Sequence, residues 1–199
     1  MIMKDKLIIV AKIISNTLNI ATWFPFITIA LLTKNHLTTE QLIIIIPTVV
    51  IFQLVIPLFY IYVLLLKKQI IDFDMSKKEE RIKPLCVCLV CLLISLVVIY
   101  FFSSRFIFMI YALIFILLLV NALITLFWKI SFHMGANTVG TLIINFLYGW
   151  QLPVLYVLLP LVFWSRLKLK KHTVAQLLGA LLINSLIIFL FLKYSGLDH

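Results

Sequence analysis

The chain has 199 residues, of which 64% are hydrophobic and only 12% are charged. A soluble domain is about half apolar and about a quarter charged, so this composition excludes an ordinary soluble protein and indicates an integral membrane protein. The formal net charge of +10 is interpreted as a topology signal and as an attraction to the lipid bilayer, with no nucleic acid as a partner.

The first apolar stretch extends over about 7–32. We expect it to be retained as a helix, because no small-residue cleavage site typical of a signal peptide follows it. Four polar residues lie within it: Ser15, Asn16, Thr17 and Asn19. Polar side chains are costly in lipid, so they are expected to face the interior of the bundle, or else the helix breaks near Pro25.

The second predicted span covers about 43–66 and contains two expected kinks, at Pro47 and Pro57. A polar loop at 67–84 follows it. The next two spans are separated by only three residues, 103–105, and are therefore predicted to form a helical hairpin. They cover about 85–102 and 106–128.

Three cysteines lie in one of these spans: Cys86, Cys88 and Cys91. No His or acidic residue accompanies them within the apolar run, so they are interpreted as small packing residues and not as metal ligands. The histidines outside the polar motifs described below, His36 and His199, are isolated in the sequence. We therefore expect neither a metal nor a cofactor.

Residues 134–164 carry no charge. As one helix they would be about 46 Å long at 1.5 Å per residue, which exceeds the hydrocarbon thickness of about 30 Å. A turn signal at 149–153, with Gly149 and Pro153, divides the stretch. The prediction is two short helices, at about 134–149 and 152–165.

A final span is predicted at about 173–193. Together these elements predict an all-α polytopic transmembrane bundle of seven spans, or six if the first segment is re-entrant. Residues 1–199 are expected to form a single domain.

With this count, the loop 67–84, the junction 129–133 and the loop 165–172 lie on the same face as the N-terminus. The cations predicted for that face are Lys4, Lys6, Lys12, Lys67, Lys68, Lys77, Lys78, Arg81, Lys83, Lys129, Arg166, Lys168, Lys170 and Lys171. The other face has Lys34, Arg105 and Lys193. The positive-inside rule therefore predicts that the first face is cytoplasmic. The predominance of Ile, Leu, Phe and Lys favours an AT-rich genome and hence the plasma membrane of a prokaryote.

Three polar stretches interrupt the apolar sequence on the predicted cytoplasmic face. They are Lys78-Glu79-Glu80-Arg81-Ile82-Lys83-Pro84, Lys129-Ile130-Ser131-Phe132-His133, and Ser165-Arg166 followed by His172. Phosphoryl transfer requires cations and donors around the phosphate oxygens, a nucleophile and an acid for the leaving oxygen. Arg and Lys bind phosphate, and His serves as nucleophile or acid near neutral pH. The stretches therefore predict a site for a phosphate monoester or diphosphate.

These stretches resemble the signature of the type-2 phosphatidic acid phosphatase superfamily, the membrane phosphatases related to vanadium haloperoxidases. Its three segments are Lys-x6-Arg-Pro, Pro-Ser-Gly-His and Ser-Arg-x5-His-x3-Asp. Ser165, Arg166 and His172 match the third, Ser131 and His133 match the second, and the first is represented by Lys78, Arg81 and Pro84. The motifs cover about two dozen residues, spread over most of the bundle.

The resemblance implies a metal-independent hydrolase that acts on a lipid phosphate: phosphatidate, phosphatidylglycerophosphate, or a polyprenyl phosphate or diphosphate. His172 would attack phosphorus to form a phosphohistidine, and His133 would protonate the leaving alcohol and then help to activate water. The implied phosphate-binding residues are Lys78, Arg81, Ser131 and Arg166.

The chain departs from the family pattern at several positions. Arg81 is three residues from Pro84 instead of adjacent to it, and Phe132 replaces the usual Gly. Gln176 replaces the Asp that orients the nucleophilic histidine. Gln accepts a hydrogen bond but carries no charge, so His172 is expected to be oriented but less activated.

Each assignment has a structural alternative. His172 and His133 are also suited to an interfacial position, and Arg166 also fits a topology signal. Lys78 and Arg81 also fit a solvated, mixed-charge loop. Thr173 and Gln176 fit a helix capping box, which would explain Gln176 without any catalytic role.

Two other functions remain open at the level of sequence. Asp72-Phe73-Asp74 before a basic loop favours a membrane prenyltransferase, in which aspartates chelate magnesium diphosphate, but the chain has no second acidic cluster. The other alternative is a non-catalytic lipid-binding or transport protein with a degenerate phosphatase site. The sequence does not predict an oligomeric state.

Overall fold

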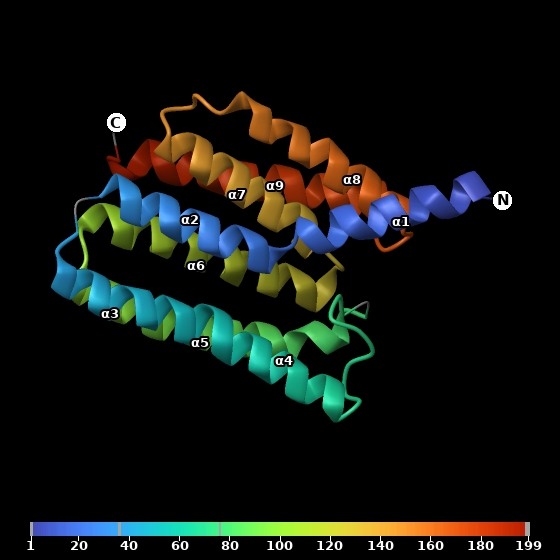
Figure 1. Ribbon diagram of the computed structural model, residues 1–199, viewed down its shortest axis with the longest axis horizontal. Coiled ribbons are helices and arrows are strands. Elements are labelled where there is room, and N and C mark those ends of the chain that lie inside the picture. The colour runs from blue at the N-terminus through green and yellow to red at the C-terminus, as the bar shows by residue number, and fades with distance from the viewer. Residues whose placement is uncertain (1, 36, 76, 198–199) are drawn as a thin grey trace. The chain divides into compact units, whose positions relative to one another are not determined.

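A computed structural model of the chain describes residues 2–35, 37–75 and 77–197. All regular structure in this part of the chain is helical and it contains no strand (Figure 1). The all-α fold class predicted from the sequence is therefore confirmed. The elements are α1 (Ile2–Thr17), α2 (Ile20–Lys34), α3 (Thr39–Val50), η1 (Ile51–Val55), α4 (Ile56–Leu66), η2 (Glu79–Arg81), α5 (Ile82–Phe102), α6 (Arg105–Phe127), α7 (Phe132–Leu147), η3 (Pro153–Val157), α8 (Leu158–Lys168) and α9 (Val174–Ser195).

The chain divides into two compact packing units. Unit 1 consists of Met1–Asn35 and Ile130–His199, and unit 2 consists of His36–Lys129. Unit 1 is therefore discontinuous in sequence: it combines α1 and α2 with the helices from α7 to α9. Unit 2 contains the helices from α3 to α6. The single domain expected from the sequence stays a prediction.

The first apolar stretch forms two helices, and its break lies at Leu18 and Asn19 instead of near Pro25, which lies within α2. Asn19 Oδ1 accepts the backbone N–H of Thr22 at 3.2 Å and thereby caps the start of α2. Thr22 Oγ1 donates to the Thr17 carbonyl at 2.7 Å, at the end of α1. The two helices are bent by 41° at this break. Local polar side chains, and not the proline, therefore divide the stretch.

The four polar residues of this stretch have different environments. Ser15 is buried, whereas Asn16 and Thr17 are exposed and Asn19 is half-buried. The expected orientation toward the interior is therefore confirmed for Ser15 alone.

In unit 2, α3, η1 and α4 form one continuous helix of 28 residues, Thr39–Leu66. A π-helical turn, η1, ends two residues before Pro57, and the Ile56 N–H bonds to the Ile51 carbonyl five residues back. Pro57 has no N–H, and its ring crowds the preceding turn, so a wider turn accommodates it. The kinks expected at Pro47 and Pro57 stay predictions: a π-helical turn precedes Pro57, and Pro47 lies within α3.

The α5 and α6 helices pack against each other in unit 2, as the predicted hairpin requires. Ser104 caps the start of α6, where its hydroxyl accepts the Ile107 N–H at 3.3 Å. Cys86, Cys88 and Cys91 are free thiols on α5.

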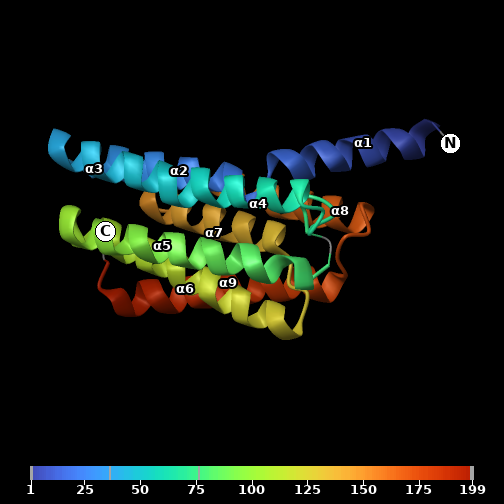
Figure 2. The ribbon, with the colours of Figure 1, turned by 90° about the horizontal axis from the view of Figure 1, so that it is seen from below.

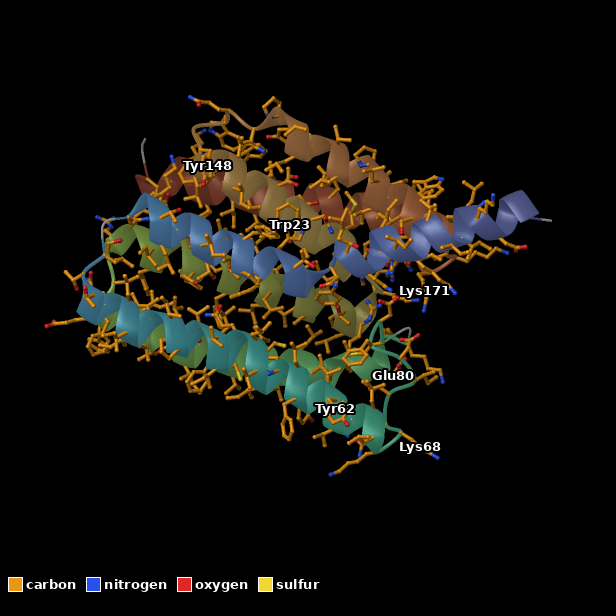
Figure 3. The ribbon with its side chains drawn as sticks, in the orientation of Figure 1. Trp23, Tyr62, Lys68, Glu80, Tyr148 and Lys171 are labelled. Carbon is orange, nitrogen blue, oxygen red and sulfur yellow. The ribbon has the colours of Figure 1, made fainter. Side chains whose placement is uncertain are left out.

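The α7 helix is the centre of unit 1, packed against α2, α8 and α9. Trp23 of α2 lies against it (Figure 3), and the Trp23 Nε1–H donates to Asn137 Oδ1 at 2.8 Å. Asn137 Nδ2 donates in turn to the Leu18 carbonyl at 3.0 Å and to the His133 carbonyl at 2.7 Å. Asn137 therefore ties the break between α1 and α2 to the central helix.

The uncharged stretch divides where the sequence predicts. α7 ends at Leu147, and η3 begins at Pro153. Gly149 adopts a positive φ of 62° in the turn, and Asn145 Oδ1 accepts the Leu152 N–H at 3.1 Å. The two predicted short helices are confirmed as α7 and the combination of η3 with α8.

Within the described residues, four helices are long and apolar enough to cross a membrane, or five if α1 and α2 are counted as one bent span. The four are Thr39–Leu66, Glu79–Phe102, Arg105–Phe127 and Val174–Ser195. The chain is thus a membrane protein by length and composition of its helices. α7 and α8, with 16 and 11 residues, fall short of this length.

Candidate active site

The connection between α8 and α9 is defined by two capping motifs in succession. At the end of α8, the Lys171 N–H bonds to the Arg166 carbonyl at 3.1 Å and the Lys170 N–H bonds to the Leu167 carbonyl at 2.9 Å. This is a Schellman motif, with Lys170 in the left-handed region at φ 53°. Thr173, the N-cap of α9, follows two residues after Lys171. The five residues between Arg166 and His172 therefore complete the C-terminal cap of α8, and His172 directly precedes the N-cap of α9.

His172 is held by the second of these motifs. Thr173 and Gln176 form a capping box, in which Gln176 N–H donates to Thr173 Oγ1 and Thr173 N–H donates to Gln176 Oε1 at 3.2 Å. The His172 Nδ1 atom lies 3.1 Å from the same Oε1. The capping box predicted from sequence is confirmed, and Gln176 also contacts the histidine.

This shared oxygen assigns the tautomer of His172. An atom that accepts the Thr173 N–H is the amide oxygen and not the nitrogen, so the His172 Nδ1 must donate to it. In the neutral imidazole, the other ring nitrogen, Nε2, then carries the lone pair. The His172 side chain is only 7% exposed, which disfavours a simple interfacial position.

Arg166 is fixed by α1, a helix that contains none of the three sequence motifs. Arg166 is 1% exposed, and its Nη1 donates to Ser15 Oγ at 2.6 Å. The adjacent Ser165 hydroxyl donates to the Ala11 carbonyl at 2.7 Å. A cation that serves only as a topology signal has no need of burial, so these contacts disfavour that alternative for Arg166.

The second motif forms the start of α7. The buried Ser131 is its N-cap, and its hydroxyl accepts the Met134 N–H at 3.3 Å. This bond uses the oxygen as an acceptor and leaves the hydroxyl proton for another acceptor. His133 is half-buried in the first turn of α7. Both residues are thus positioned by a helix start, as are His172 and Gln176.

The second and third motifs lie at one end of unit 1. α7 and α9 pack side by side and both begin at this end, while α8 ends there and α1 extends from it (Figures 1 and 2). Figure 3 marks this end with Lys171 and the opposite end of α7 with Tyr148. Two helix N-termini present partial positive charge, and this arrangement favours an anion.

Lys78 and Arg81 belong to unit 2, where both make contacts of their own. Lys78 Nζ donates to the Leu126 carbonyl in the last turn of α6 at 3.3 Å. Arg81 is 4% exposed, and its Nε donates to the Met75 carbonyl at 2.8 Å. The alternative of a solvated cation is therefore wrong for Arg81, and both residues organise the loop before α5.

The acidic residues of this loop bear on the prenyltransferase alternative. Asp72 and Asp74 are half-buried. The described residues contain no group of three or more His, Cys, Asp or Glu side chains placed to hold a metal ion. His36 and His199 lie outside the described residues.

The contact of Ser15 with Arg166 was missed by sequence reasoning, which treated Ser15 only as a polar residue in a span. The two residues are 151 positions apart, and no local pattern connects them. The available signal was a group of polar residues inside an apolar stretch, which indicates a functional or structural partner.

No family model, curated protein or solved structure was found that matches this chain.

Proposed function

We propose that the chain is a membrane-embedded phosphatase that hydrolyses a lipid phosphate through a phosphohistidine intermediate on His172. The observation that carries the proposal is the hydrogen bond from His172 Nδ1 to Gln176 Oε1 at 3.1 Å. It places the proton of the neutral imidazole on Nδ1 and hence the lone pair, the nucleophilic electron pair of a histidine, on Nε2. A buried arginine and two helix N-termini at the same end of unit 1 supply the positive potential that a phosphate requires.

In the proposed reaction, His172 Nε2 attacks phosphorus and forms a P–N bond while the P–O bond to the lipid alcohol breaks. His133 gives its proton to the leaving oxygen and then takes a proton from the attacking water. The water oxygen bonds to phosphorus, the P–N bond breaks, and inorganic phosphate leaves. Arg166 and Ser131 stabilise the phosphate oxygens, and Lys78 and Arg81 are assigned the same role by the resemblance alone.

The substrate is proposed to be phosphatidate, phosphatidylglycerophosphate or a polyprenyl phosphate or diphosphate that enters sideways from the bilayer. The proposed setting is the plasma membrane of a prokaryote, with the site facing the cytoplasm. Six to seven crossings are proposed, in which α7 and α8 each cross as short helices in a locally thinned bilayer.

The test is phosphate release from a panel of these lipids by the purified protein in detergent, with and without EDTA. We expect release that EDTA does not reduce. His172→Ala is expected to abolish it, and His133→Ala to slow it by about 10²- to 10⁴-fold, the usual effect of losing a general acid. His36→Ala is the control, because this histidine is outside the motifs.

A second measurement identifies the intermediate. After rapid acid-free quenching of a reaction with ³²P-labelled lipid, the wild-type protein should carry label that is stable to base and labile to acid, as a phosphoramidate is. His172→Ala should carry none. Absence of release from every lipid, or release unchanged in His172→Ala, would favour the non-catalytic lipid-binding alternative.

A further inference from the structure

The Arg166 guanidinium and the Ser15 hydroxyl form a buried polar pair between α8 and α1. Their side chains are 1% and 2% exposed, and Arg166 Nη1 lies 2.6 Å from Ser15 Oγ. We propose that Ser15 is a further phosphate-binding residue, which positions Arg166 and donates its own proton to the same oxyanion. This inference rests on the proposed function, because it places the phosphate of that reaction at Arg166.

The first step of the argument is the hydrogen-bonding capacity of Ser15. A serine hydroxyl has one proton to donate and two lone pairs to accept with. Ser15 Oγ accepts from the arginine, which has no acceptor of its own, so the hydroxyl proton is not used in this contact. Among the described residues, no hydrogen bond donated by Ser15 Oγ is found.

The second step concerns the usual hydrogen bond of a serine or threonine in a helix. Its hydroxyl donates to the backbone carbonyl four residues earlier. Thr28, Thr48, Ser95 and Thr138 all donate to that carbonyl. For Ser15 this carbonyl belongs to Ala11, which already accepts the Ser165 hydroxyl at 2.7 Å and lies in the backbone ladder of α1. Both of its lone pairs are therefore in use.

The third step is the chemistry of the missing acceptor. A buried hydroxyl proton without an acceptor is unfavourable, and a neighbouring guanidinium selects an anion. A tetrahedral phosphate oxygen can accept from the hydroxyl and from the guanidinium together. Because both residues are buried in this structure, entry of the oxyanion requires the packing around the pair to open.

The test measures binding of two probes to the purified full-length protein in detergent: inorganic phosphate, and phosphatidate in mixed micelles. Ser15→Ala is expected to weaken both by about tenfold or more, as does the loss of a hydrogen bond to a charged group. Ser15→Thr keeps the hydroxyl and should restore most of the affinity. If phosphatidate is hydrolysed, KM should rise in Ser15→Ala by a similar factor, with a smaller change in kcat.

Ser165→Ala is the matched comparison, because it removes a hydrogen bond between the same two helices without touching Arg166. The loss of phosphate affinity in Ser15→Ala should exceed the loss in Ser165→Ala at least about fivefold, although both variants lose one cross-helix bond. Equal losses of phosphate affinity in the two variants would show that Ser15 contributes only to helix packing, and would overturn the inference. Tighter binding in Ser15→Ala would also overturn it, because Ser15 would then merely occupy the place of the anion.

The outcomes separate this inference from the proposed function. Phosphate binding that depends on Ser15, in a protein that hydrolyses no lipid, would uphold the inference and reject the enzyme. Hydrolysis with the same KM and phosphate affinity in Ser15→Ala and Ser165→Ala would uphold the enzyme and reject the inference. A wild-type protein that binds neither probe would reject both.

Discussion

Gln176 Oε1 accepts hydrogen bonds from two donors, the Thr173 N–H and His172 Nδ1. Gln176→Glu preserves the length of the side chain and its capping role, but it adds a negative charge beside the imidazole. A nearby negative charge favours protonated histidine, so the neutral form of His172, the proposed nucleophile, should exist only at higher pH. We expect the acidic limb of the pH–rate profile to move up by about 1 pH unit, with a higher plateau rate because the charge stabilises the cationic phosphohistidine.

Thr173→Ala separates this effect from helix capping. It removes the hydroxyl that accepts the Gln176 N–H and leaves the contact of Gln176 with His172 in place. We expect about 1 kcal/mol lower stability, with the acidic limb of the profile at its wild-type position. The same shift of the limb in Thr173→Ala and Gln176→Glu would show that the profile reports the helix start and not the charge beside His172.

At the scale of residues, sequence reasoning succeeded where contacts are local. The capping box at Thr173 and Gln176 and the turn at Gly149 were predicted from short spacings, because their donors and acceptors are a few residues apart. Arg166 was predicted to be a site residue, and its burial and its bond to Ser15 depend on the packing of α8 against α1. No pattern within one helix contains that information.

The packing of α2 against α7 depends on the absence of a side chain at Gly140. A Cβ atom there would lie 2.1 Å from Trp23 Cδ2 and Cε3. The indole cannot move aside freely, because its Nε1–H is bonded to Asn137 at 2.8 Å. Gly140→Ala should therefore lower the free energy of unfolding by about 2–4 kcal/mol, from overpacking and the lost hydrogen bond. Unfolding by SDS titration in detergent micelles measures this change.

A double-mutant cycle with Trp23→Ala identifies the cause. Trp23→Ala alone is expected to be destabilising by about 3–5 kcal/mol. In that background the clash is absent, so Gly140→Ala should cost little, and the coupling between the two sites should be favourable by more than about 1 kcal/mol. Additive effects would instead attribute the cost to the backbone of α7.

At the scale of elements, one prediction that rested on length is confirmed, and the count of six or seven spans stays a prediction. The uncharged stretch was too long for one helix and divides at its turn into α7 and α8. The break in the first stretch was expected near Pro25 but occurs at Asn19, which caps the start of a new helix. Pro25 is the sixth residue of that helix and removes one of its backbone hydrogen bonds without ending it. A strong local cap thus outweighed the proline signal.

At the scale of the whole molecule, each packing unit, considered separately, carries most of its Lys and Arg residues at one end of its helices. In unit 1 the cations at the motif end include Lys6, Lys12, Arg166, Lys168, Lys170 and Lys171, against Lys34 and Lys193 at the other end. In unit 2 the end of α4 and the start of α5 carry Lys67, Lys68, Lys77, Lys78, Arg81 and Lys83, against Arg105 at the start of α6. The number of crossings could not be read from hydropathy alone, because α7 and α8 are short and polar side chains on α7 are buried by its neighbours.

This polarity predicts a cytoplasmic location for the motif end of unit 1. In a variant whose three native cysteines are replaced by alanine, single cysteines at Lys170 and Gln151 probe the two ends, since both positions are exposed and lie in the turns that follow α8 and α7. A membrane-impermeant maleimide should label Gln151→Cys in intact cells and Lys170→Cys only after lysis. Label at both positions in intact cells would mean that α8 does not cross the bilayer, and label at Lys170→Cys alone would reverse the orientation. In the reversed case the phosphate of an outer-leaflet lipid, and not that of a cytoplasmic one, would reach His172.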